Sequence, residues 1–127
     1  MAGKKVLLVE DDKFLREMLA QKLIKQELEV QAAVDGKNAL DILANFLPDL
    51  IILDLLLPDI DGFGVLENVR KNDKTKNIPV VVLSNLDKAA DMERAQKLGA
   101  NDFMVKSNFS VNEIISRAKE MLGIAAA

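Results

Sequence analysis

The segment Leu50-Ile51-Ile52-Leu53-Asp54 decides the fold. Four consecutive apolar residues are typical of a parallel strand that is buried on both faces. Asp54 then places a carboxylate where this pattern would continue with another hydrophobic residue. A buried carboxylate is costly unless a metal, a cation or water meets it, and ligands bind at the carboxyl ends of strands in open α/β sheets. Asp54 is therefore the candidate reactive centre.

Four further apolar runs complete the strand pattern, at residues 6–9, 28–34, 80–83 and 103–105. Because helical patterns separate the five runs, they predict a parallel, doubly wound (βα)5 sheet. The first helix is marked by apolar residues at steps of three and four, namely Phe14, Leu15, Met18, Leu19, Leu23 and Ile24. Four methionines fall at spacings typical of a core: Met18, Met92, Met104 and Met121.

Residues suited to helix ends support this assignment. Asp12, Asp87 and Ser110 are placed to cap the first, fourth and fifth helices, because their side chains accept hydrogen bonds from free backbone N–H groups. Gly99 and Gly123 are placed to end the fourth and fifth helices, since glycine adopts the left-handed conformation common there.

Composition bounds the class of protein. A chain of 127 residues, half of them apolar, is long enough for one domain with a substantial core, and we assign residues 1–127 to a single domain. The net charge of −3 comes from 17 basic and 20 acidic residues with the two signs interspersed. This pattern argues against direct nucleic-acid binding and against a basic membrane-binding patch.

Two residue types that often build sites are absent from the sequence, which contains neither cysteine nor histidine. Disulfides, thiolate ligands and imidazole ligands are therefore excluded, and any metal must be held by oxygen. We also find no signal peptide and no apolar run long enough to span a bilayer. The expected location is the cytoplasm.

Polar residues follow four of the five apolar runs. They are Glu10, Asp11 and Asp12 after the first, Asp54 after the third, Ser84 and Asn85 after the fourth, and Lys106 after the fifth. The carboxyl ends of parallel strands meet at one edge of the sheet, so these side chains are expected to converge. Converging acids repel each other unless a hard divalent cation joins them, and oxygen ligands suit magnesium. The sequence therefore predicts a Mg²⁺ site.

The same residues carry a resemblance to a known family. The motifs are Val9-Glu10-Asp11-Asp12, Leu53-Asp54 with Leu57-Pro58-Asp59-Ile60-Asp61-Gly62, Leu83-Ser84, and Gly99-Ala100-Asn101-Asp102-Phe103-Met104-Val105-Lys106. Together they resemble the receiver domain of two-component response regulators, and in particular the single-domain chemotaxis receivers. The resemblance covers about residues 4–122 and implies a flavodoxin-like fold with strand order 2-1-3-4-5 and five flanking helices. Residues 123–127 are expected to be a frayed or engineered tail.

The resemblance implies a phosphoryl acceptor at Asp54. The donor would be a sensor histidine kinase or a histidine phosphotransfer protein, as in a phosphorelay. Mg²⁺ would be held by Asp11, Asp54 and the backbone carbonyl of Leu56, with Glu10 acting mainly through metal-bound water. The domain would then catalyse only its own phosphorylation and dephosphorylation, and would not be an enzyme with an external substrate.

Further roles are implied for the residues around that acid. Lys106, Ser84 and the backbone amides of Leu55 and Asn85 would hold the phosphoryl oxygens. Ser84 and Phe103 would form a switch, in which the hydroxyl moves toward the phosphoryl group and the ring turns inward. Because Phe103 lacks the phenol of many family members, we expect its coupling to be biased inward.

This sequence departs from the family pattern directly after Lys106. Lys106 is followed by Ser107 where the family usually has proline in a cis peptide. A cis bond before serine costs about 3 kcal/mol, so we predict a trans peptide and a rearranged loop. The rim positions Leu56 and Leu86 are both apolar, which favours slow autodephosphorylation.

Other readings of single acids remain open. Asp12 is either a helix cap or part of the metal site. Asp59 and Asp61 lie in a Pro-Asp-Ile-Asp-Gly turn, where acids commonly cap the following helix, and we exclude them from the site.

Two other functions compete with the signalling module. One is a Mg²⁺ phosphohydrolase with an aspartyl nucleophile, but that chemistry typically needs a general acid two residues later, where this chain has Leu56. The other is a scaffold with the receiver fold that works without phosphorylation. For the signalling module, we expect the fourth helix, fifth strand and fifth helix to bind a target or form a phosphorylation-dependent homodimer. Output comes either from a separate protein target or from a linked output domain absent from this chain.

Overall fold

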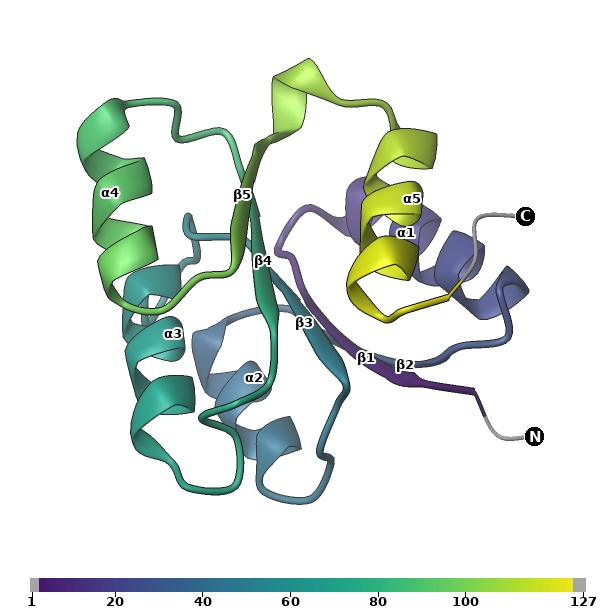
Figure 1. Ribbon diagram of the computed structural model, residues 1–127, viewed down its shortest axis with the longest axis horizontal. Coiled ribbons are helices and arrows are strands. Elements are labelled where there is room, and N and C mark those ends of the chain that lie inside the picture. The colour runs from purple at the N-terminus through teal and green to yellow at the C-terminus, as the bar shows by residue number, and fades with distance from the viewer. Residues whose placement is uncertain (1–2, 125–127) are drawn as a thin grey trace.

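The computed structural model describes residues 3–124 and contains, over that range, the predicted alternation of strands and helices (Figure 1). The strands are β1 (Lys5–Val9), β2 (Glu29–Ala33), β3 (Leu50–Leu53), β4 (Val80–Ser84) and β5 (Asp102–Val105). The helices are α1 (Lys13–Lys25), α2 (Gly36–Leu43), α3 (Gly62–Lys71), α4 (Ala89–Lys97) and α5 (Val111–Met121), with a short 3₁₀ helix, η1 (Lys106–Asn108), before α5. All neighbouring strands are parallel, in the order β2-β1-β3-β4-β5. This order confirms the flavodoxin-like arrangement.

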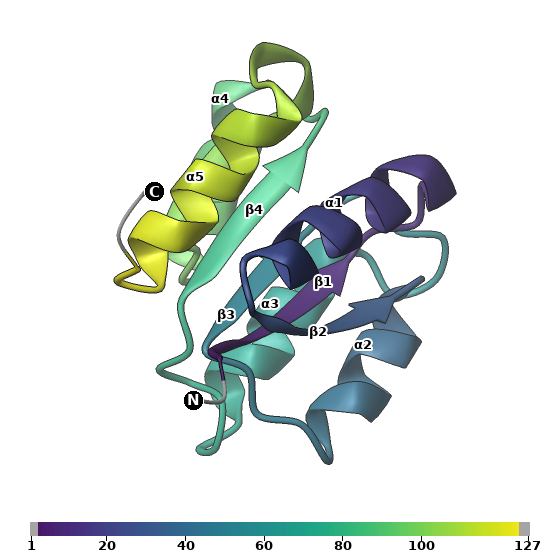
Figure 2. The ribbon, with the colours of Figure 1, turned by 90° about the vertical axis from the view of Figure 1, so that its right-hand side faces the viewer.

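Helices cover both faces of the sheet. Figures 1 and 2 show α1 and α5 on one face, with α2, α3 and α4 on the other. Alternate residues of β1 therefore enter different cores: Val6 and Leu8 pack in the cluster beneath α1 and α5, whereas Leu7 and Val9 pack beneath α2 and α3. The continuous apolar runs in the sequence are explained by this double coverage.

The apolar pattern of α1 predicts its buried face only in part. Leu19 and Leu23 are fully buried, but Phe14, Met18 and Ile24 are 81%, 46% and 56% exposed. A helix turns about 100° per residue, so a residue directly before or after a buried one lies well to the side of the buried face. The expectation that Met18 belongs to the core is therefore wrong.

Side chains cap α1, α3 and α5 as the sequence indicates. Asp12 and Asp61 accept hydrogen bonds at the starts of α1 and α3, and Ser110 forms a complete capping box at the start of α5. The prediction for Asp87 is wrong, because α4 begins at Ala89 and its N-cap position is Lys88. Asp87 thus lies one residue outside the cap and cannot serve the first turn in the usual way.

Glycines follow the last turns of α4 and α5. Gly99 and Gly123 have φ angles of 102° and 70°, in the left-handed region that favours glycine. Both predicted helix ends are confirmed. The expected tail begins at Gly123, and its residues 125–127 lie outside the described part of the chain. Among the helices within residues 3–124, none has the length and apolar character needed to cross a membrane.

Candidate functional site

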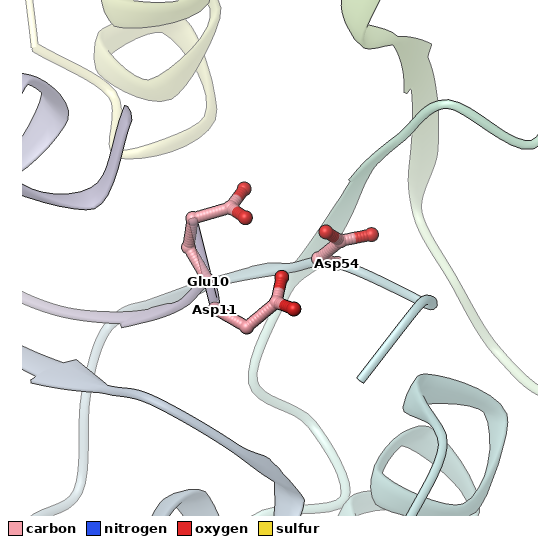
Figure 3. Close-up of side chains that lie close together, drawn as sticks. All are labelled: Glu10, Asp11 and Asp54. Carbon is pink, nitrogen blue, oxygen red and sulfur yellow. The ribbon is translucent and has the colours of Figure 1, made fainter. Parts of the chain in front are cut away.

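Strand register brings the acids together at one end of the sheet. Val9 of β1 pairs with Leu53 of β3, so Glu10 and Asp54 are the next residues on two hydrogen-bonded strands. The Asp54 N–H donates to the Val9 carbonyl at 3.0 Å and extends this pairing by one step. Figure 3 shows Glu10 and Asp11 after β1 and Asp54 after β3, with their side chains close together.

The three carboxylates form a compact oxygen cluster. Glu10, Asp11 and Asp54 each offer an oxygen within 4.8 Å of the others. Glu10 and Asp54 are only 1% and 3% exposed, while Asp11 is exposed. Hard divalent cations prefer oxygen ligands and keep several waters, so two buried acids beside one open to solvent fit Mg²⁺.

Lys106 lies against the two buried acids. Its Nζ atom is 2.8 Å from Glu10 Oε1 and 2.7 Å from Asp54 Oδ2. Burial pushes the pKa of Lys106 down, but hydrogen bonds and charges from both acids outweigh this and raise it above its usual value. Lys106 is therefore a fixed cation that offsets carboxylate repulsion.

Burial strongly perturbs the carboxyl group of Glu10. Burial raises the pKa of Glu10 from 4.5 to about 7, and the negative charge of Asp54 adds to this effect. The hydrogen bonds from Lys106 and from the Asp12 N–H act in the opposite direction. Glu10 therefore gains a proton readily in the metal-free protein, and a bound cation would favour its charged form.

Both oxygens of Asp54 are engaged. Oδ2 accepts from Lys106, and Oδ1 accepts from the backbone N–H of Leu56 at 3.0 Å. The family resemblance implies a role for the Leu56 carbonyl but not for its amide. The spacing is the signal that could have indicated this bond, because an Asp side chain commonly accepts from the backbone N–H two residues later. Leu56 itself is 51% exposed.

The predicted switch residues lie on β4 and β5. Ser84 is fully buried, and its hydroxyl accepts from the Leu86 N–H at 3.4 Å. Ser84 pairs with Val105, the residue before Lys106, so it lies at the same end of the sheet. Phe103 is partly buried and packs against a small cluster formed by Leu55, Phe63, Val82 and Ala95.

The remaining acids at this end have structural contacts. Asp12 accepts from the Leu15 N–H at 3.2 Å, which identifies it as a cap outside the carboxylate cluster. Asp59 accepts from the N–H groups of Gly36 and Lys37 at 2.8 and 2.9 Å. These bonds lower the pKa of Asp59 and tie the loop after β3 to the start of α2. Sequence reasoning expected a cap of the following helix instead.

Two backbone features shape the site. A Cβ atom on Gly62 would lie 2.4 Å from the carbonyl oxygen of Asp54 and from Cα of Leu55. Glycine is therefore needed for α3 to begin against the strand end that carries Asp54. The Lys106–Ser107 peptide is trans, as predicted, since residues 3–124 contain no cis peptide, and the chain continues into η1.

A doubly wound parallel sheet with an acidic cluster and a lysine at its carboxyl end defines the class of protein. The chain matches the response regulator receiver domain family over residues 6–119. It is 34% identical over 118 residues to the DNA-binding dual master transcriptional regulator RpaA of Synechocystis, covering 93% of this chain and 48% of that protein. The chain therefore belongs to the receiver domains of two-component response regulators.

Solved structures agree with this assignment. The receiver domain of the Francisella response regulator 1452 superposes with a TM-score of 0.85 at 31% identity, covering 95% of this chain and 98% of that one. The Mn²⁺-bound form of response regulator Rcp1 superposes with a TM-score of 0.82 at 31% identity, covering 92% of each chain. This chain spans about half the length of the curated relatives that it matches; the matched region is 48% of the length of RpaA.

Proposed function

We propose that Asp54 accepts a phosphoryl group from a phosphohistidine in a Mg²⁺-dependent reaction. The donor is a sensor histidine kinase or a histidine phosphotransfer protein. The observation that carries this proposal is the position of Asp54, which is 3% exposed between two further carboxylates and the Lys106 ammonium group. A receiver domain provides this arrangement for group transfer and not for turnover of a separate substrate.

The transfer needs one nucleophile and little other covalent chemistry from the protein. A carboxylate oxygen of Asp54 forms a bond to phosphorus while the P–N bond of the phosphohistidine breaks. The bonding electron pair stays on the imidazole nitrogen of the donor. Lys106 and the Leu56 amide each donate to one oxygen of Asp54 and hold this carboxylate in position for the step.

We assign the metal ligands to Asp11, Asp54 and the Leu56 carbonyl, with Glu10 acting through a bound water. The fit of the oxygen cluster to a hard cation supports this assignment. The Mn²⁺-bound form of Rcp1 shows that a related receiver holds a divalent cation. When bound, Mg²⁺ would neutralise charge on the phosphoryl oxygens.

The surrounding groups would hold the product and report its presence. Lys106, Ser84 and the amides of Leu55 and Asn85 would donate to the phosphoryl oxygens. Lys106 is already in contact with Asp54, and Ser84 lies at the same end of the sheet. Movement of Ser84 would be coupled to an inward turn of Phe103.

Output would follow from a changed surface on α4, β5 and α5. That surface would bind a protein target or a second copy of the chain. Because RpaA is described as a DNA-binding regulator and the chain matches 48% of it, a linked output domain is an alternative to a separate partner. We place the protein in the cytoplasm, where two-component phosphotransfer takes place.

Two other functions fit the site less well. A phosphohydrolase with an aspartyl nucleophile needs a general acid, and Leu56 occupies the position two residues after Asp54. A scaffold that works without phosphorylation has no use for a buried Asp54, which costs free energy to maintain. The apolar rim residues Leu56 and Leu86 further favour slow loss of the phosphoryl group.

The test is incubation with acetyl phosphate, with and without Mg²⁺, followed by intact mass measurement. We expect the mass of one phosphoryl group to be added only with Mg²⁺ and only when Asp54 is present. Asp54→Asn removes the nucleophile, and Asp12→Asn is the matched control because asparagine also caps helices. No adduct on the wild-type protein, or equal labelling of Asp54→Asn, would refute the proposal.

A further inference from the structure

Arg16 reaches back from α1 to the turn that carries two of the acids. Its Nη1 atom donates to the backbone carbonyl of Glu10 at 2.9 Å and to that of Asp11 at 3.2 Å. The side chain is partly buried. One guanidinium nitrogen therefore bridges two consecutive carbonyls and restrains the peptide between the two acids.

This restraint matters most for Asp11. Within residues 3–124, Lys106 forms ion pairs with Glu10 and Asp54, whereas no ion pair includes Asp11. The Asp11 side chain is exposed, so its direction toward the cluster depends on its backbone. The Arg16 bridge restrains that backbone through the carbonyls of Glu10 and Asp11.

The bridge is not needed to begin the helix. Asp12 already caps α1 by accepting from the Leu15 N–H, and the Asp12 carbonyl accepts from the Arg16 N–H at 2.9 Å. The charged end of Arg16 thus serves the turn before the cap. Hydrogen bonds from a charged donor are stronger than those between neutral groups.

We propose that Arg16 is a positioning residue for Mg²⁺ binding, which acts by orienting the Asp11 carboxylate through the backbone of the acidic turn. The inference rests on the Mg²⁺ site of the proposed function. Groups that orient metal ligands typically contribute about 10- to 100-fold to metal affinity. Because Arg16 restrains mainly one of the ligands, we expect an effect of about tenfold.

The experiment is titration of metal-free protein with Mg²⁺ by calorimetry. Arg16→Met keeps an unbranched stem but loses every donor, and we expect it to weaken Mg²⁺ binding about tenfold. Arg16→Lys keeps the charge without the planar fork and should recover only part of the affinity. Lys13→Ala is the matched control, because it removes an exposed cation near the start of the same helix.

A second measurement separates positioning from stability. We expect the Mg²⁺ concentration for half-maximal phosphorylation by acetyl phosphate to rise in Arg16→Met by the same factor as the dissociation constant. The rate at saturating Mg²⁺ should stay close to that of the wild type. A purely structural role would lower the melting temperature and leave the Mg²⁺ affinity of the folded protein unchanged.

Each alternative result is decisive. Wild-type Mg²⁺ affinity in Arg16→Met would overturn the inference while the proposed function stands. An equal loss in Lys13→Ala would overturn it too, because the cause would then be charge at a distance. If Arg16→Met does not fold, wild-type affinity in Arg16→Lys overturns it. If the wild-type protein binds no Mg²⁺, the proposed metal site is wrong, and the inference about Arg16 is overturned with it.

Discussion

Replacing Lys106 by methionine tests whether this lysine holds the buried acids in the metal-free protein. Lys106 is 15% exposed and lies 2.8 Å and 2.7 Å from side chains of Glu10 and Asp54 that are 1% and 3% exposed. Removing one member of a buried ion pair costs about 3–5 kcal/mol, because the partner charge stays buried. Since Lys106 is partly open to water, we expect a loss near the lower end, about 3 kcal/mol.

The loss should depend on pH with a definite sign. The pKa of Glu10 is raised to about 7 in the folded protein, so the neutral acid is favoured there relative to the unfolded chain. Removing Lys106 raises that pKa further. Stability of the variant should therefore increase as the pH falls from about 8 to about 5.5, and the difference from wild type should shrink to about 1–2 kcal/mol.

The assay is urea denaturation in EDTA at both pH values, with Lys97→Met as the control. Lys97 pairs with Glu93 at 3.1 Å, but both side chains are more than half exposed, at 75% and 66%. Such a pair contributes about 0.3–0.5 kcal/mol. The double variant Lys106→Met with Glu10→Gln should recover part of the loss, because one buried charge is gone. A loss that is equal at both pH values, or no larger than that of Lys97→Met, would refute the reasoning.

Three further substitutions test the frame around the site. Ser110→Ala removes the capping box of α5, and urea denaturation should show a loss of about 1 kcal/mol; an unchanged midpoint would contradict the capping role. Gly62→Ala places a Cβ 2.4 Å from the carbonyl oxygen of Asp54. We therefore expect about 1–3 kcal/mol of destabilisation and slower labelling of Asp54 by acetyl phosphate. A wild-type labelling rate would argue against this close packing. Arg94→Ala removes a guanidinium group that lies 4.0 Å from the centroid of the Phe63 ring. The free energy of unfolding should fall by about 0.5–1 kcal/mol, and amide hydrogen exchange in α4 should become faster. Unaltered exchange would show that this contact does not hold the helix.

Much of the fold could be read from local patterns. The apolar runs predict all five strands. Continuous hydrophobic residues mark β1, β3 and β4, which are buried on both faces, whereas the edge strand β2 mixes polar and apolar residues and is largely exposed. The spacing of the runs predicts parallel pairing through helical crossovers, and the strand order came from the family resemblance. Helix boundaries were predicted well where a side chain accepts from its own first turn, as at Ser110. They failed at Asp87, where a shift of one residue removes the contact.

The principal site residues were also predictable, for a topological reason. Glu10, Asp54 and Lys106 each follow a strand, and parallel strands end at the same edge of the sheet. Their convergence therefore needs no knowledge of side-chain conformation. The turn motif already excluded Asp59 from the site, but the sequence could not separate these acids from Asp12, because residue type alone does not show where the backbone directs a carboxylate.

The sequence by itself determined the alternation of strands and helices, the chemistry at the strand ends and the oxygen character of any metal site. Only the tertiary structure decided that Phe14 is exposed, that Asp59 joins α2 and that Arg16 bridges the acidic turn. The physical reason is the range of the interactions involved. Strand and helix patterns depend on neighbouring residues, whereas these contacts depend on how a helix is rotated against the sheet and where a loop folds back. Those positions are set by the packing of the whole domain.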